Sequence, residues 1–119
     1  MIRTRDQIWA ERAAQRVNHV TSEKDKYLSF ARSFPSLIHT CGLMQALAFV
    51  AKKNQGYLCD FVFVLNGGQQ DVGYLRTVYE MKLMEYVVTS RDAIQAASWL
   101  KRYAEALLDE PNATGDDSQ

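Results

Sequence analysis

The segment 35–53, PSLIHTCGLMQALAFVAKK, restricts the possible folds more than any other part of this chain. If it forms one helix, apolar side chains cover almost its whole circumference. One broad arc holds Leu37, Leu43, Met44, Leu47, Ala48, Val50 and Ala51, and the opposite side holds Ile38, Cys41 and Phe49. A helix without a polar face is normally surrounded by other helices. The segment therefore predicts a bundle organised around a central helix near 35–53.

The length and composition are those of one folded domain. With 119 residues, 47% of them hydrophobic, the chain can bury a substantial core without disulfides or metals. The N-terminus is charged and carries no signal-peptide pattern, and no apolar run approaches the roughly 18 residues of a membrane span. Cys41 and Cys59 lack CxxC spacing. We therefore expect two reduced thiols in a cytoplasmic protein that has no membrane partner.

The formal net charge of zero combines two unlike halves. Residues 1–53 carry nine Lys and Arg against four Asp and Glu, whereas residues 54–119 carry five against ten. Four of those ten carboxylates belong to the tail 109–119, which has no apolar pattern and is expected to be disordered. Residues 1–108 then form a helical domain with a modest positive charge. Such a domain suits a polyanion or a charged protein partner.

Hydrophobic periodicity and turn residues predict six helices and no sheet. A helix is expected to end at the Phe34–Pro35 step, because proline disfavours helical geometry in the preceding residue. Ser22 is a reasonable N-cap for the helix expected at 23–33. Thr89 with Asp92 resembles a capping box at the start of the last helix, 90–108. The expected helices cover residues 4–20, 23–33, 35–53, a short segment within 57–65, 71–88 and 90–108. The predicted fold class is all-α, a compact single-domain bundle of about five to six helices.

The helix expected at 71–88 has more apolar surface than an outer helix needs. Tyr74, Val78, Met81 and Met84 form its second apolar face. Tyrosine and methionine are favoured at protein interfaces, so these four residues are candidates for a protein contact. Burial of both faces inside the bundle is the alternative explanation.

The sequence offers no persuasive catalytic set. His19 and His39 fall on different predicted helices, and neither has a partner motif or metal-ligand spacing. The glycines of the segment 66–69 lack the pattern of a phosphate-binding loop. We therefore expect a protein that is not an enzyme and that binds no metal or cofactor.

Basic residues supply the strongest candidates for function. Arg5, Arg12 and Arg16 share one face of the first predicted helix, and Lys52 and Lys53 end the helix near 35–53. Cations aligned in this way can follow the phosphates of a nucleic acid without reading its bases. A solvated helix face, with the lysines complementing the helix dipole, explains the same pattern equally well.

A second basic group is weaker. Lys101 and Arg102 lie in the last predicted helix, where Lys101 and Glu105 form an ordinary i,i+4 ion pair. We keep both cations as candidates for nucleic-acid contact.

One order of residues resembles a known family. It begins with Pro35, Ile38, Gly42–Leu43, the run QALAF at 45–49 and Lys52, and it ends with WLKRYAEA at 99–106. This order and spacing resemble the small subunit of the Cmr complex, the type III-B CRISPR effector that uses a guide RNA to target foreign RNA. The resemblance covers essentially the whole folded part, whereas the acidic tail is not part of the family pattern.

The resemblance implies a compact helical protein without nuclease activity of its own. Several copies would stack as an inner filament beside the backbone subunits of the antiviral ribonucleoprotein, next to guide RNA and target RNA. On this interpretation the basic residues contact phosphates and the Tyr74 face meets protein neighbours.

Two other functions remain open from the residues alone. One is a small DNA-binding regulator whose segment 90–102 reads a groove, although that segment offers few side chains for reading bases. The other is an adaptor that binds only protein and whose arginines are merely solvated.

Overall fold

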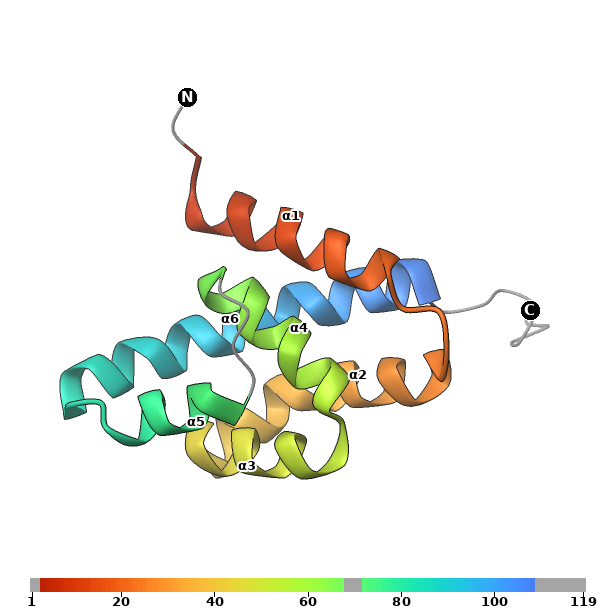
Figure 1. The fold of residues 1–119 in the computed structure, drawn as a ribbon. Coiled ribbons are helices and arrows are strands. Elements are labelled where there is room, and N and C mark those ends of the chain that lie inside the picture. Colours follow the sequence, from red (N-terminus) through yellow and green to blue (C-terminus); the bar gives the residue numbers. More distant parts are fainter. Residues whose placement is uncertain (1–2, 68–71, 109–119) are drawn as a thin grey trace.

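The computed structural model describes residues 3–67 and 72–108, and this part of the chain is entirely helical apart from its short connections (Figure 1). The predicted all-α fold class is confirmed. The acidic tail 109–119 lies outside the described residues. The helices are α1 (Arg5–Asn18), α2 (Lys24–Cys41), α3 (Leu43–Lys53), α4 (Gln55–Asn66), α5 (Val72–Tyr79) and α6 (Leu83–Leu108).

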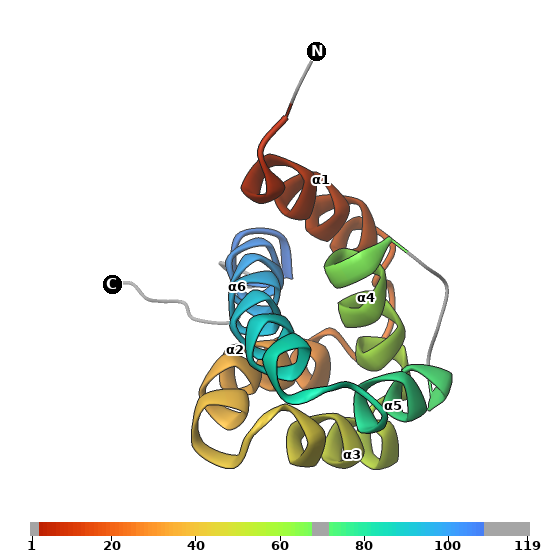
Figure 2. The same ribbon diagram turned by 90° about the vertical axis from the view of Figure 1, so that its left-hand side faces the viewer.

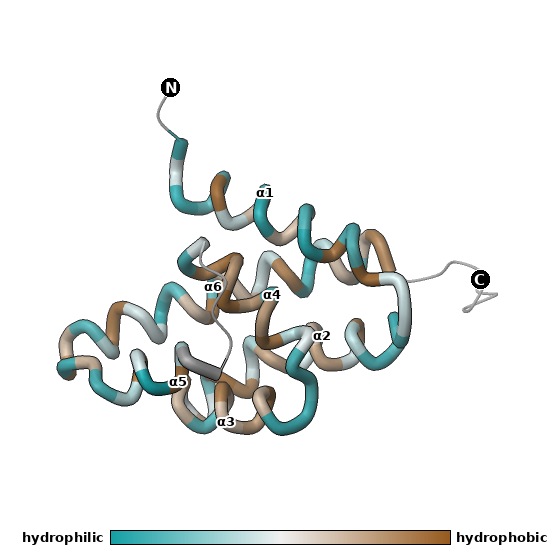
Figure 3. The backbone as a smooth tube through the Cα atoms, in the orientation of Figure 1, coloured by the Kyte–Doolittle hydropathy of each residue, from teal (hydrophilic) through white to brown (hydrophobic). Residues whose placement is uncertain are grey.

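The long helix α6 is the spine of the molecule. It packs most extensively against α2 and α1, while α4 lies against α1, α3 and α6. Figure 2 looks approximately along α6 and shows α1, α2 and α4 beside it, while α3 and α5 lie farther away. Figure 3 shows that α4 is mainly hydrophobic and α1 mainly hydrophilic, as expected for an inner and an outer helix. No helix of the described ranges is both long and apolar enough to cross a bilayer.

The prediction of one central helix over 35–53 is wrong, because two helices meet within this range. Helix α2 continues through Pro35 and ends at Cys41, and Gly42 then separates it from α3. Gly42 has φ +89° and ψ 159°, a conformation that is easily reached only without a Cβ atom. Pro35 removes one hydrogen bond from α2, because proline has no backbone N–H. The helix nevertheless continues, since the burial of Phe34 and Ile38 in the core holds it on both sides of the proline. The chain therefore turns at the glycine rather than at the proline, and α3 packs back against α2.

Helix α3 also has a solvent face, contrary to the expectation of an apolar circumference. Its buried side consists of Leu43, Ala46, Leu47 and Val50. Its exposed side carries Gln45, Ala48, Phe49 and Lys52. Phe49 thus lies on the solvent face of α3.

The boundary predicted between 71–88 and 90–108 is also wrong. Helix α5 ends at Tyr79, and α6 runs without a break through Thr89, so the expected capping box is absent. Ala93, Ala96 and Leu100 of α6 are fully buried. Tertiary packing along α6 thus overrides a weak local signal at Thr89. By contrast, the expected start of the first helix is confirmed, since Thr4 and Gln7 form its capping box.

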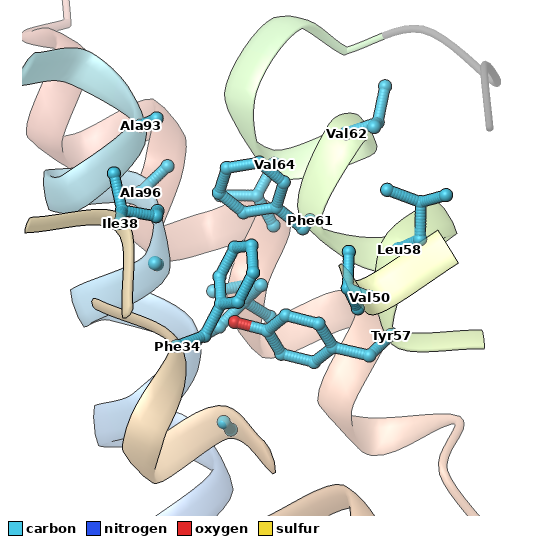
Figure 4. Packing of buried hydrophobic residues seen from close by; sticks show 14 of the residues in the cluster. Phe34, Ile38, Val50, Tyr57, Leu58, Phe61, Val62, Val64, Ala93 and Ala96 are labelled. Carbon is cyan, nitrogen blue, oxygen red and sulfur yellow. The ribbon is translucent and has the colours of Figure 1, made fainter. Parts of the chain in front are cut away.

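The core is built on aromatic side chains from α2 and α4. Figure 4 shows Phe34, Tyr57 and Phe61 packed together. The ring centroids of Phe34 lie 5.2 Å from Tyr57 and 5.0 Å from Phe61, both in edge-to-face geometry. Such pairs stabilise a core beyond the area they bury. The segment 57–65, predicted as a short helix, is confirmed as part of α4.

The hydroxyl groups of two tyrosines in this core differ in one respect. The Tyr27 hydroxyl donates a hydrogen bond to Asp60 Oδ2 at 2.7 Å, whereas the buried Tyr57 hydroxyl meets no partner among the described residues. A buried hydroxyl without a hydrogen bond lowers the stability of the fold, whereas a hydrogen-bonded one adds to it. We expect Tyr27→Phe to lower the free energy of unfolding by about 1 kcal/mol and Tyr57→Phe to leave it unchanged or raise it by up to about 1 kcal/mol. Urea denaturation of the two variants checks this, and a larger loss in Tyr57→Phe contradicts it.

Candidate nucleic-acid interface

Arg16 holds α1 against α4, through Asp60 and Phe63. Its Nε atom donates to Asp60 Oδ1 at 2.9 Å, and its guanidinium lies 4.7 Å from the centroid of the Phe63 ring. Asp60 of α4 accepts at its other oxygen from Tyr27 of α2. Burial raises the pKa of Asp60, and the hydrogen bonds from Tyr27 and Arg16 oppose that rise. Arg16 is therefore largely engaged by the fold.

Arg12 caps the C-terminal end of α4. Its Nη1 atom donates to the carbonyl of Val64 at 3.2 Å, beside Trp9 Nε1, which donates to the carbonyl of Leu65 at 3.3 Å. The last carbonyls of a helix lack backbone partners and carry partial negative charge, so a guanidinium is favourable there. Arg12 thus also has a structural role.

Arg5 is the most accessible of the three arginines on α1. It forms an ion pair with Asp92 of α6 at 2.8 Å, but 69% of its side chain remains exposed. The carboxylate partners of Arg16 and Arg5, which are Asp60 and Asp92, lie 44 and 87 residues away along the chain. No local pattern could have found them.

Lys52 and Lys53 extend into solvent from the last turn of α3. Lys53 Nζ lies 5.9 Å from the centroid of the exposed Phe49 ring. Within residues 3–67 and 72–108, neither lysine forms an ion pair with a carboxylate. Of the predicted cations, these two are the most available for a phosphate.

The second basic group differs from its prediction. The expected Lys101–Glu105 pair is wrong, because Glu105 accepts from Arg32 of α2 at 3.1 Å. Lys101 is half-buried, and Arg102 is exposed with its guanidinium 4.9 Å from the Trp99 ring centroid. This group lies on α6 and the lysine pair lies on α3, so they are separate parts of the surface.

The predicted protein-contact face needs a correction. Tyr74 and Val78 are core residues with 5% and 2% exposure, so they are not available to a partner of the folded chain. Met81 is half-buried, and Met84 is 73% exposed. The prediction treated 71–88 as one helix, whereas the turn after Tyr79 changes which side chains face outward.

Exposed apolar side chains instead gather where α5 ends and α6 begins. We call this region the α5–α6 corner. Its residues are Tyr79, Leu83, Met84, Val87 and Val88, each at least 42% exposed. Exposed apolar side chains grouped on adjacent helical turns mark a site of protein contact more often than single scattered ones do. Met84 belongs to the predicted second apolar face, but its exposure together with Val88 depends on the turn after Tyr79, which was not predicted.

Candidate metal ligands do not gather in the described part of the chain: no three His, Cys, Asp or Glu side chains come together there. His19 and His39 lie on different helices as expected, His19 at the C-terminal end of α1 with its Nδ1 atom 2.6 Å from the carbonyl oxygen of Gln15.

The fold and surface define a small all-helical protein that presents exposed cations and an exposed apolar corner. The sequence profile of the family described as CRISPR-associated protein (Cas_Cmr5) matches residues 5–107, a range that takes in parts of all six helices. This chain belongs to that family, which confirms the resemblance to the Cmr small subunit.

Individual relatives agree with this assignment. The CRISPR system Cmr subunit Cmr5 of Thermus thermophilus is 34% identical over 116 residues, covering 92% of this chain and 100% of that protein. The X-ray crystal structure of a CRISPR-associated Cmr5 family protein from Thermus thermophilus matches with a TM-score of 0.82 and 33% identity. That match covers 88% of this chain and 98% of the crystallised one.

Proposed function

We propose that this chain is a non-catalytic subunit of a Cmr CRISPR ribonucleoprotein in the cytoplasm, where it helps to hold guide RNA and target RNA. Its protein partners are the backbone subunits and further copies of itself. Membership of the Cmr5 family supports the complex, since a relative at 34% identity is itself named a Cmr subunit. The observation that carries the RNA contact is the exposed pair Lys52 and Lys53.

The lysine pair suits a phosphate backbone. Two adjacent ammonium groups that pair with no carboxylate among the described residues keep their charge available, and neutralising phosphates releases counterions from the RNA. Arg5 adds a partly exposed cation on α1, and Lys101 and Arg102 add two on α6. Arg12 and Arg16 support the surface by holding α1 on α4.

The α5–α6 corner suits a protein neighbour. Covering its exposed side chains with a partner surface is favourable, by about 25 cal/mol for each Å² of apolar area removed from water. An RNA backbone offers little apolar surface in return. We therefore assign RNA contact to the lysine end of α3 and protein contact to the α5–α6 corner.

The double variant Lys52→Gln/Lys53→Gln tests the RNA contact in the reconstituted complex with its guide RNA. Removing two phosphate contacts reduces the slope of log affinity against log salt by about 1.4 to 1.8 units for each copy of the subunit that contacts the RNA. We expect this reduction for target RNA, with normal assembly of the complex. Filter binding over a series of salt concentrations measures the slope.

A matched control is Arg76→Gln/Lys82→Gln, which removes two exposed cations from α5 and the turn after it. We expect this control to keep the original slope. An unchanged slope in the lysine variant, with the complex assembled, contradicts the RNA contact.

A second candidate is an adaptor that binds protein only. It is favoured by one observation, namely that Arg12 and Arg16 are engaged within the fold. The DNA-binding regulator has no such support, because 90–102 lies inside α6 with Ala93, Ala97 and Leu100 buried. The salt experiment separates the adaptor from the RNA-contacting subunit.

A further inference from the structure

A groove lies between the first half of α2 and the end of α3. Its volume is about 790 Å³, and its lining includes Phe30, Phe49, Lys26 and Lys53. Ser29 and Asn54 add a hydroxyl and an amide to this lining. The groove thus combines an aromatic surface with cations and small hydrogen-bonding groups.

The aromatic surface is the outer end of a cluster of aromatic rings that continues into the core. Phe49 is 45% exposed, and its ring packs on Phe30 with centroids 5.8 Å apart and planes 23° from parallel. Phe30 in turn lies 5.4 Å from the fully buried Tyr57 and 5.9 Å from the fully buried Phe34. Because the core holds Phe30, the Phe49 ring rests on a firm support although it faces solvent.

We propose that this groove binds one unpaired nucleotide of single-stranded RNA, with the base stacked on Phe49 and a neighbouring phosphate held by Lys53. This inference rests on the proposed RNA contact and specifies its form. Aromatic side chains bind single strands because every base has a π-face, and the stack is tolerant of sequence. Bases within a duplex are already stacked on one another, so a duplex cannot use this surface.

Charge fixes how the nucleotide lies. Glu23 and Asp25 line the α2 end of the groove, and Glu23 Oε2 lies 3.8 Å from Lys26 Nζ. With Lys26 beside Glu23, the α2 end carries one net negative charge, whereas Lys52 and Lys53 make the α3 end positive and attract a phosphate there. The backbone of the RNA therefore follows the end of α3, and the base points into the groove.

The ammonium group of Lys53 can leave the Phe49 ring and make room there for a base. Its ammonium lies 5.9 Å from the Phe49 centroid, close to the limit of about 6 Å for a cation–π contact, so that contact is weak. Its flexible stem lets the ammonium move from the ring to a phosphate. The base then replaces a weak cation–π contact with stacking on the exposed part of the Phe49 ring.

The test is an NMR titration of the full chain with hexauridine and with an RNA duplex of equal length. We expect hexauridine to shift the ring signals of Phe49 and Phe30, and the duplex to leave them in place. Phe49→Leu keeps the apolar bulk but removes the π-face, and it should weaken hexauridine binding about tenfold. Phe49→Trp, which keeps and enlarges the π-face, should bind at least as tightly as the original chain.

Each result decides the proposal. Equal affinity of Phe49→Leu, equal shifts with the duplex, or no shift at these rings overturns it. So does a peptide ligand that shifts these rings when hexauridine does not. Failure here is distinguishable from failure of the proposed function: if Phe49→Leu has no effect while Lys52→Gln/Lys53→Gln reduces the salt slope of the complex, the RNA contact stands without the stacked base.

Discussion

Replacing Gly42 with alanine should lower the free energy of unfolding by about 2 to 3 kcal/mol. At φ +89° and ψ 159° an added Cβ places the residue in a region that side chains rarely adopt. Its nearest neighbour would be the Tyr86 hydroxyl at 3.8 Å, so the cost arises from the backbone rather than from a collision. Urea denaturation of the variant and the original chain measures the difference.

The sign of this effect distinguishes the two descriptions of residues 35–53. If they formed one continuous helix, Gly42→Ala would raise stability by about 0.8 to 1 kcal/mol, as alanine does in a helix interior. Gly56→Ala is the matched control, because Gly56 lies in α4 without a positive φ and its added Cβ makes an ordinary 3.5 Å contact with Asn54. We expect a small gain at Gly56 and a clear loss at Gly42, and a gain at both contradicts the break.

Removing the Asp60 carboxylate should be the most damaging change to the α1–α2–α4 junction. Asp60→Ala leaves the buried Tyr27 hydroxyl without its acceptor and Arg16 without its counter-charge. Breaking a buried pair by deleting one partner costs about 3 to 5 kcal/mol, and since a third of the Arg16 side chain is exposed we expect about 2 to 3 kcal/mol. The midpoint of chemical denaturation gives this value.

The control for Asp60 is another carboxylate that accepts from an arginine of α1. Asp92→Ala removes the partner of Arg5, whose side chain is 69% exposed and can turn to water. Exposed ion pairs contribute about 0 to 1 kcal/mol, so Asp92→Ala should have a small effect. Equal losses in the two variants would show that Asp60 does not tie the three helices together.

The fold class follows from the sequence because apolar residues recur at helical spacing along most of the chain. The start of α1 is equally local, since Thr4 and Gln7 are three residues apart. The limits of α2 and α3 are not local. Pro35 and Gly42 are both signals for a break, and the burial of Phe34 and Ile38 decides between them.

The candidate site divides in the same way. The cationic character of Lys52 and Lys53 and their place at a helix end are evident from the sequence. The engagement of Arg16 by Asp60 is not, because the partner lies on another helix. The exposure of Phe49 could not be predicted from one helix over 35–53, because apolar residues then cover the whole circumference. The shorter helix α3 has a solvent face, and Phe49 lies on it.

The most direct measurement is photo-crosslinking in the reconstituted complex, with 4-thiouridine placed at successive positions of the target RNA or the guide RNA. We expect crosslinked peptides from this subunit to include the end of α3, with Phe49, Lys52 or Lys53 carrying the nucleotide. If an assembled, RNA-bound complex crosslinks through its other subunits and never through this one, the proposed RNA contact is wrong.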